Sequence, residues 1–190
     1  MRSVTYYVAA SADGYIAGPD GQFDFFGFDG DLAAWIIAEY PETLPVQARE
    51  ALGIADRDNR RFDTVLMGRR TYQPALDAGI ASPYPHLRQV VFSTTLSPGS
   101  NGVEVTEADP LDRVRELKDT DGAGIWLAGG GRLAAALRSE IDELVIKRNP
   151  IVLGAGVPLV DGSFAPQAFD RTSTRSFDTG VVVEVYRRAG

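Results

Sequence analysis

Short apolar stretches separated by turn residues dominate the hydrophobic pattern of the chain. From Val4 to Ala10, apolar positions such as Tyr6 and Val8 alternate with others, which is typical of a β-strand. Ile125–Ala128 instead form an unbroken apolar run, and such a run suits a strand buried on both faces of a parallel sheet. The same patterns predict further strands over residues 62–67, 89–93, 103–105, 143–147, 169–177 and 181–187.

Helical spacing occupies several of the intervals between these strands. The helices expected from it cover residues 32–40, a short stretch that ends before Gly79, residues 110–118 and residues 133–137. Asp29 or Asp31 can cap the first helix, and Asp109 or Pro110 begins the third. A weak apolar stripe over residues 46–59 predicts a partly helical segment, which we interpret as an insertion or lid at about residues 42–61.

The order of these elements predicts the fold class. Strands alternate with helices, and a turn at residues 178–180 joins the last two strands in a hairpin. This order predicts an α/β fold with a mixed, mostly parallel sheet, flanking helices and a C-terminal β-hairpin. We expect a single domain over residues 1–190.

Two glycine turns follow predicted strands and open predicted helices. Gly129, Gly130 and Gly131 expose bare backbone before a helix start, where free N–H groups can hold a phosphate. Their spacing is not G-x-G-x-x-G, so a tight turn without a ligand remains the alternative. Arg69 and Arg70 follow Gly68 at a second such turn, where two cations are unfavourable unless an anion lies nearby. The alternative for this turn is two solvated arginines.

Composition narrows the classes of function. The formal net charge of -7 disfavours nucleic-acid binding by a basic surface. The chain contains no cysteine, which excludes disulfides, thiolate metal sites and cysteine nucleophiles. Its one histidine, His86, lies in a predicted loop, so we expect no metal site. No apolar run approaches the ~20 residues that a membrane helix needs, and Met1–Tyr6 lead directly into a strand, so a cytoplasmic protein is expected.

Several stretches together resemble a known family. Three of them resemble the dihydrofolate reductase fold: Val65–Tyr72, Val90–Ser93 and Trp126–Gly131. Three others resemble the reductase domain of the bifunctional riboflavin-biosynthesis deaminase/reductase and its stand-alone relatives: Ala9–Ala17, Ile141–Ile146 and Leu153–Leu159. The resemblance covers most of the chain and leaves only about Glu42–Arg61 unmatched.

The resemblance implies that NADPH binds at the glycine turns. By this resemblance, the pyrophosphate and the adenosine phosphate are bound by Gly68, Arg69, Arg70 and Thr71, and the adenosine is lined by Ser93 and Thr94. The pyrophosphate is also surrounded by Gly129, Gly130, Gly131, Arg132 and Leu133. The nicotinamide is bordered by Ala10, Ile16 and Gly18. Arginine and hydroxyl partners favour a 2′-phosphate over a free 2′-OH, so NADPH is expected rather than NADH.

The residues that would meet the substrate are less defined by the resemblance. In true dihydrofolate reductases an acidic residue near the start of the first helix binds the pterin, and Asp31 resembles that position. Asp24 is its rival, because stand-alone relatives carry an Asp-aromatic pair there. For both, a helix cap or loop turn is the alternative. Phenylalanines at 23, 25, 26 and 28 can stack on a flat heterocycle or pack in the core. Lys147 and Arg148 are candidates for a ribosyl phosphate.

These features predict an NADPH-dependent reductase that transfers a hydride to a small heterocycle, such as 5-amino-6-(5-phosphoribosylamino)uracil. A deaminase would need a cysteine-containing zinc site, which the chain lacks, and this leaves the riboflavin role open. Two alternatives remain, namely a dihydrofolate reductase and a non-catalytic nucleotide- or flavin-binding module. The resemblance also implies a homodimer.

Overall fold

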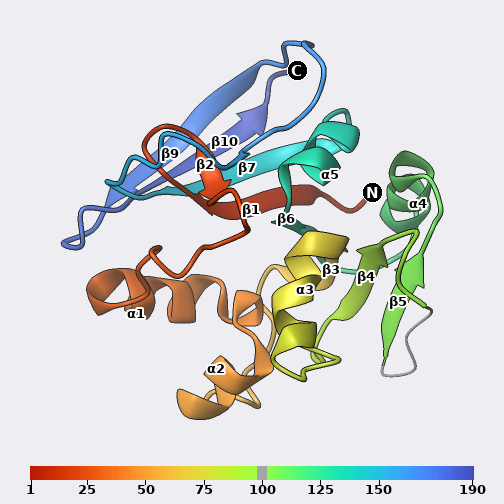
Figure 1. Ribbon diagram of the computed structural model, residues 1–190, viewed down its shortest axis with the longest axis horizontal. Coiled ribbons are helices and arrows are strands. Elements are labelled where there is room, and N and C mark those ends of the chain that lie inside the picture. Colours follow the sequence, from red (N-terminus) through yellow and green to blue (C-terminus); the bar gives the residue numbers. More distant parts are fainter. Residues whose placement is uncertain (98–101) are drawn as a thin grey trace.

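Eight strands form one sheet in the order β5-β4-β3-β6-β1-β7-β10-β9 in the computed structural model, which describes residues 1–97 and 102–190 (Figure 1). The strands from β5 to β7 are mutually parallel, whereas β10 and β9 are antiparallel and close the sheet as a hairpin. The strands are β1 (Val4–Ala10), β3 (Phe62–Gly68), β4 (Arg88–Phe92), β5 (Val103–Thr106), β6 (Gly124–Gly129), β7 (Ile141–Arg148), β9 (Phe169–Ser176) and β10 (Val182–Arg188). The predicted α/β fold with a mostly parallel sheet and a terminal hairpin is therefore confirmed.

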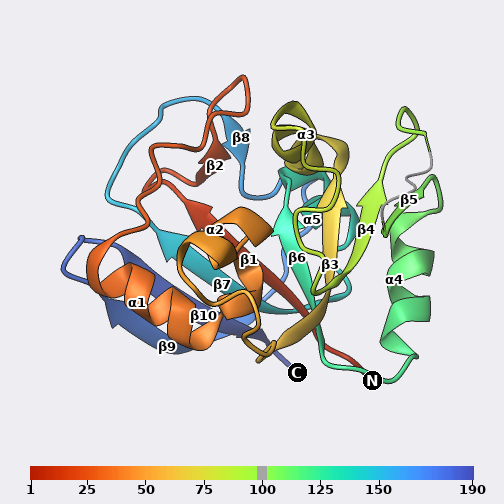
Figure 2. The ribbon, with the colours of Figure 1, turned by 90° about the horizontal axis from the view of Figure 1, so that it is seen from below.

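Helices cover both faces of this sheet (Figures 1 and 2). On one face lie α1 (Gly30–Glu39), a short 3-10 helix (Pro41–Thr43), α2 (Val46–Ala51) and α3 (Arg69–Asp77). On the other lie α4 (Pro110–Lys118) and α5 (Gly131–Ala136). Successive side chains of β1 point to opposite faces, so that Tyr7 joins the first core while Tyr6 and Val8 join the second.

Two loops beyond the C-terminal ends of the central strands are joined to each other. The loop after β1 contains β2 (Tyr15–Ala17), and the loop after β7 contains β8 (Val157–Pro158), which pairs with it. Asp13 reinforces the pairing, because its carboxylate accepts hydrogen bonds from Ser11 Oγ and from the main-chain N–H groups of Leu153 and Gly154. These hydrogen bonds, led by that from Ser11, lower the pKa of Asp13 to about 2.

The helix starts differ in how they are capped. Asp109 caps α4 as expected, since its Oδ1 accepts from Leu111 N at 2.8 Å. The expectation that Asp29 or Asp31 caps the first helix is wrong. Asp29 is the N-cap residue but makes no side-chain capping bond, and Asp31 instead accepts from Asp178 N at 3.1 Å, in the turn between β9 and β10. The carboxylate of Asp31 thus fastens the hairpin to α1.

The segment at residues 42–61 is anchored by two buried charged side chains. Glu42 accepts hydrogen bonds from Arg61 N at 2.6 Å and Phe62 N at 2.9 Å, which fixes the entrance to β3. The guanidinium of Arg49 donates to the main-chain carbonyls of Pro41, Ala55 and Arg57. The α-helical part of the segment is Val46–Ala51, and the 3-10 helix Pro41–Thr43 overlaps its beginning.

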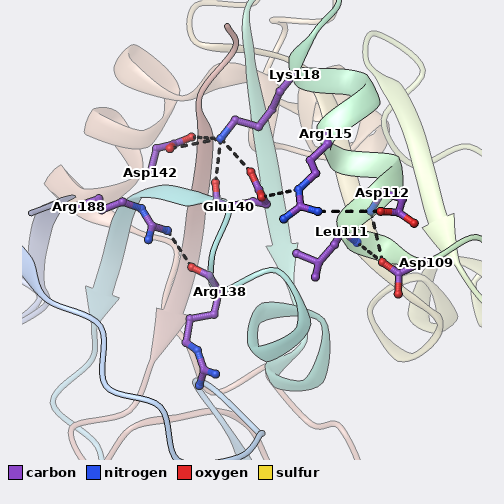
Figure 3. A network of polar contacts seen from close by, with 9 residues as sticks. All are labelled: Asp109, Leu111, Asp112, Arg115, Lys118, Arg138, Glu140, Asp142 and Arg188. Atoms are coloured by element: carbon purple, nitrogen blue, oxygen red, sulfur yellow. Dashed lines mark hydrogen bonds and ion pairs between the residues drawn. The ribbon is translucent and has the colours of Figure 1, made fainter. Parts of the chain in front are cut away.

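A network of charges closes the end of the sheet where the parallel strands begin (Figure 3). Lys118 at the end of α4 contacts Glu140 at 3.4 Å and Asp142 at 3.0 Å, and Arg115 donates to Glu140 at 2.9 Å. Asp142 also accepts from Val4 N at 2.8 Å. The network joins α4 to the first residues of β1 and β7, and it leaves the opposite edge free for a ligand site. Within the described residues, no helix has the length and apolarity required to cross a membrane.

Candidate cofactor and substrate cavities

Two cavities lie at the edge where the parallel strands end. This is the edge at which open α/β sheets usually bind ligands. The first, which we call the arginine cavity, has a volume of about 360 Å³. It is lined by Arg69, Phe92, Ser93, Thr94, Thr95, Thr106, Glu107, Ala108 and Pro110.

Arg69 gives the arginine cavity a cationic wall. Its Nη1 atom is buried and has no hydrogen-bond partner among the described residues. A buried guanidinium nitrogen without a partner is costly, and a phosphate oxygen would satisfy it. Ser93 Oγ accepts from Thr95 N at 3.2 Å and Leu96 N at 3.1 Å, and it lies 3.4 Å from Thr95 Oγ1, where either hydroxyl can donate. The cavity therefore fits a phosphate group.

One acidic residue in the same cavity bears on which cofactor it takes. Glu107 lines the same cavity as Arg69 and carries the opposite charge. A carboxylate is the usual partner of a free ribose 2′-OH, whereas arginine and hydroxyl groups accommodate a 2′-phosphate. The cavity lining contains one acidic residue, one arginine and four hydroxyl side chains. This composition favours a 2′-phosphate over a free 2′-OH.

The glycines of the two turns differ in what surrounds them. A side chain at Gly68 would meet nothing within 4 Å, and one at Gly129 or Gly130 would meet only Thr71 Oγ1, at 3.8 and 3.6 Å. These three positions leave open backbone at the ends of β3 and β6, and Thr71 lies between them. Gly131 is different, because a Cβ there would lie 2.3 Å from Pro158 O. Its missing side chain makes room for the chain beside β8.

The other predicted cofactor residues occupy varied places. Leu133 is buried in the second core, and Arg132 is exposed and pairs with Asp161 at 3.2 Å. Thr94 is exposed and lines the arginine cavity, whereas Arg70 is exposed and is not part of its lining. Towards the other end of the edge, Ala10 is buried at the end of β1, Ile16 lies in β2, and Gly18 closes a turn by donating from its N–H to Gln22 O at 2.7 Å.

The second cavity, which we call the aromatic cavity, has a volume of about 220 Å³. It is lined by Tyr7, Ala9, Phe26, Gly27, Phe28, Ile36, Thr43, Leu44, Tyr84, Trp126, Ala128 and Lys147. Ala9 and Ala128 directly precede Ala10 and Gly129 in the chain. The aromatic cavity therefore lies next to Ala10, one of the residues predicted to border the nicotinamide.

Lys147 lies among the rings of the aromatic cavity. Its Nζ lies 3.5 Å from the centroid of the Tyr7 ring, a cation–π distance. Trp126 packs edge-on against Tyr84 at 5.1 Å, and its Nε1 donates to Tyr7 O at 3.0 Å. Burial lowers the pKa of Lys147 to about 7, because an ammonium loses its hydration there. Lysine is the only charged residue type in this lining.

The two predicted acidic residues do not line either cavity. Asp31 is exposed and bound to the hairpin, as described above, and Asp24 is exposed on the loop between β2 and α1. Phe26 and Phe28, from the same loop, do line the aromatic cavity. Arg148 is directed elsewhere, because it pairs with Glu184 at 3.0 Å.

Sequence reasoning placed Lys147 near a phosphate rather than among aromatic rings. The available signal was its phase in the strand. Lys147 follows Val145 by two positions in β7 and therefore shares its inward face, where a charged residue is unusual. Tyr84 and Thr43 come from irregular segments, and nothing in the local pattern marked them as parts of a cavity.

Comparison with known proteins identifies the family. The sequence profile of the RibD C-terminal domain matches residues 2–183, and the chain belongs to that family. It is 32% identical over 167 residues to YwjB, an uncharacterized protein of Bacillus subtilis (strain 168), with 83% of this chain and 82% of YwjB covered. It is 26% identical over 203 residues to YyaP, another uncharacterized protein of that strain, with 100% and 97% covered.

A solved structure supports the same fold. A protein of Shewanella sp. PV-4, provisionally described as a riboflavin biosynthesis protein, matches with a TM-score of 0.69 and 24% identity over 100% of both chains. The predicted resemblance to the riboflavin-biosynthesis reductase family within the dihydrofolate reductase-like fold is thereby confirmed.

Proposed function

We propose that this protein is an NADPH-dependent reductase that transfers a hydride to a small, flat heterocycle. The observation that carries the proposal is a hydroxyl-lined cavity with Arg69 in its wall, at the same sheet edge as the aromatic cavity. The buried Nη1 of this arginine has no hydrogen-bond partner among the described residues. Membership of the RibD C-terminal domain family supports reductase activity in general. An aminopyrimidine such as 5-amino-6-(5-phosphoribosylamino)uracil is the first acceptor to test.

The residues divide the work between binding and orientation. Arg69, Ser93 and Thr94 would hold the adenosine phosphate, and the open backbone at Gly68 and Gly129–Gly130 would admit the pyrophosphate. The cofactor supplies the hydride when bound. Aromatic side chains around the second cavity would hold the acceptor flat and exclude water from it.

The first test is a titration of the purified protein with NADPH and NADH, followed by cofactor fluorescence. We expect a preference for NADPH and a loss of about 10- to 150-fold in affinity for Arg69→Ala, because a hydrogen bond to a charged group is worth about 1.5–3 kcal/mol. Arg88→Ala is the matched control, since Arg88 lies at the opposite end of β4 and pairs with Glu104 at 3.0 Å. Equal binding of both cofactors by wild type and Arg69→Ala would refute the proposed phosphate site.

Two outcomes separate this function from the alternatives. A dihydrofolate reductase that used Asp31 would lose dihydrofolate turnover in Asp31→Asn and keep NADPH binding. We expect Asp31→Asn to keep its turnover, because that carboxylate lies against the hairpin. Tight NADPH binding without oxidation by pterin, aminopyrimidine or quinone acceptors would instead indicate a non-catalytic binding module.

Two broader features remain part of the proposal. A cytoplasmic location suits an enzyme supplied with NADPH and a metabolic acceptor. A homodimer is expected from the family resemblance, and light scattering on the purified protein tests it directly.

A further inference from the structure

The aromatic cavity contains a charge where none is needed for packing. Lys147 replaces what would be an apolar position on the inward face of β7, next to Val145 in the first core. Burying an ammonium is costly unless it is paired. Across residues 1–97 and 102–190, Nζ makes no ion pair, and its close contact is the face of Tyr7. The geometry thus holds an ammonium at the wall of a small cavity with no anion to neutralise it.

The titratable groups around Lys147 form no ion pair with it among the described residues. From β1 and the loop after α3 come Tyr7 and Tyr84, and Tyr40 stacks on Tyr7 at 4.5 Å. Three carboxylates lie on the surrounding elements. Glu39 is engaged by Arg61, and Glu143 by Thr5 and Arg187. Glu42 accepts from the main chain of residues 61 and 62 through Oε1, whereas its Oε2 is buried and has no hydrogen-bond partner among the described residues. On the neighbouring strand β10, Val183 is the register partner of Lys147, and Glu184 pairs with Arg148.

We propose that Lys147 is the proton donor to the acceptor in the aromatic cavity, and that the group reduced is a C=O or C=N bond in a compound that carries a flat heterocycle. The inference rests on the proposed function. The carbon of that bond gains a hydride from the dihydronicotinamide, which is oxidised, and the heteroatom takes a proton from Nζ as the π bond is lost. The neutral amine then regains a proton from water. A lowered pKa fits this role, because an ammonium that titrates near neutral pH can give up its proton and recover it.

Position supports the assignment as well as charge. In the register of the sheet, Lys147 lies opposite Ala9 of β1, the residue before Ala10. Ala128 of β6 lines the same cavity directly before Gly129. Nζ therefore enters the cavity at the end predicted to meet the nicotinamide. A donor that must act on the atom next to the hydride acceptor belongs at this end.

The first test measures the proton on Lys147 without any cofactor. The chain contains two lysines, Lys118 and Lys147, so protein labelled with [13C]lysine gives two Cε signals, and Lys147→Met assigns them. We expect the Lys147 signal to titrate with a midpoint near 7. A midpoint near the unperturbed value of about 10.4 would overturn the proposal.

The second test separates proton donation from phosphate binding. Arginine keeps the positive charge of Lys147 but does not release its proton at neutral pH. With 5-amino-6-(5-phosphoribosylamino)uracil as the probe, we expect both Lys147→Arg and Lys147→Met to lower kcat by about 10²- to 10⁴-fold. Their Kd for NADPH should stay at the wild-type value. If Lys147→Arg keeps the wild-type kcat and KM, the side chain anchors an anion and donates no proton.

The dependence of kcat on pH distinguishes proton donation by Lys147 from a purely structural role, which would leave that dependence unchanged. The donor must be protonated, so the wild-type kcat should fall about tenfold per pH unit above the Lys147 midpoint, and this limb should be absent in Lys147→Arg. Failure of the proposed function is recognised separately, as a wild-type protein that binds no NADPH. If NADPH binds and no probe with a C=O or C=N bond is reduced, the inference is overturned, because there is then no reduction in which Lys147 donates a proton.

Discussion

Arg49 shows how this protein buries a charge by hydrogen bonds to the main chain. The side chain is 2% exposed, and its guanidinium donates to three main-chain carbonyls of the segment that surrounds it. Such a residue organises irregular backbone that no helix or strand can satisfy. Lys147 in β7 is the opposite case, because its half-buried side chain forms no ion pair among the described residues. The contrast separates a charge that holds the fold from one that is left for a ligand.

We predict that Arg49→Met destabilises the protein by about 1–3 kcal/mol. Methionine fills similar space but leaves the carbonyls of Pro41, Ala55 and Arg57 without their donors. Urea unfolding measures the loss. Arg57→Ala is the control, because Arg57 contributes its main-chain carbonyl to this cluster and its side chain is exposed. Equal stabilities for Arg49→Met and wild type would show that solvent replaces the guanidinium.

At the scale of elements, the glycine turns after β3 and β6 look alike in sequence but are built differently. Gly68 has open space around it, whereas Gly131 is pressed against the chain at Pro158. One glycine leaves room for a ligand and the other for a neighbouring segment. The local sequence could not reveal this difference, because β8 approaches α5 from 20 or more positions away in the chain, as the hydrogen bond from Asp161 N to Gly131 O shows.

A pair of alanine substitutions should separate the two roles. Gly68→Ala should leave the melting temperature near the wild-type value, since its backbone has an ordinary negative φ, and should weaken NADPH binding by obstructing the pyrophosphate. Gly131→Ala should cost about 1–3 kcal/mol of stability, because the new methyl group would overlap Pro158 O. Thermal melts with and without NADPH measure both. The hypothesis is wrong if Gly68→Ala unfolds easily or binds NADPH normally.

Local patterns predicted most of the elements, since each depends on neighbours in sequence. The alternation in residues 4–10 and the apolar run at 125–128 are strands, and Asp109 caps its helix. The acidic candidates show where this reasoning ends. Asp31 matched the position of a substrate-binding acid, yet its partner is the N–H of Asp178, 147 positions away. The hydrogen-bond partner of such a side chain is set by tertiary packing, and the local sequence does not contain that information.

For the whole molecule, the charge network in Figure 3 ties stability to pH. Burial alone would raise the pKa of Glu140, but the hydrogen bond from Arg115 and the charge of Lys118 outweigh it and hold the pKa below the usual value of 4.5. A carboxylate with a lowered pKa stabilises the fold above its unfolded-state pKa, and that stabilisation is lost as the pH falls through the folded-state value. This network therefore stabilises the protein at neutral pH and fails in acid.

We predict that Glu140→Gln lowers the melting temperature at pH 7 by roughly 4–8 °C, equivalent to about 2 kcal/mol for a chain of this size. The difference from wild type should shrink as the pH falls below 4.5, where the wild-type carboxylate also becomes neutral. Melting curves between pH 3 and pH 7 measure it. Glu116→Gln is the control, because Glu116 is an exposed surface partner of Arg113. A difference that is constant with pH would assign the effect to packing instead.

The strand order has a consequence for how the chain is made. Strand β1 is synthesised near the beginning, yet its neighbours β6 and β7 begin only at residues 124 and 141. A nascent chain that stops before residue 124 has β1 with two unpaired edges. Strand β1 therefore cannot pair with its neighbours until most of the chain has been synthesised. During that interval the unpaired strand is prone to aggregation, and chaperones that bind the emerging chain reduce this risk.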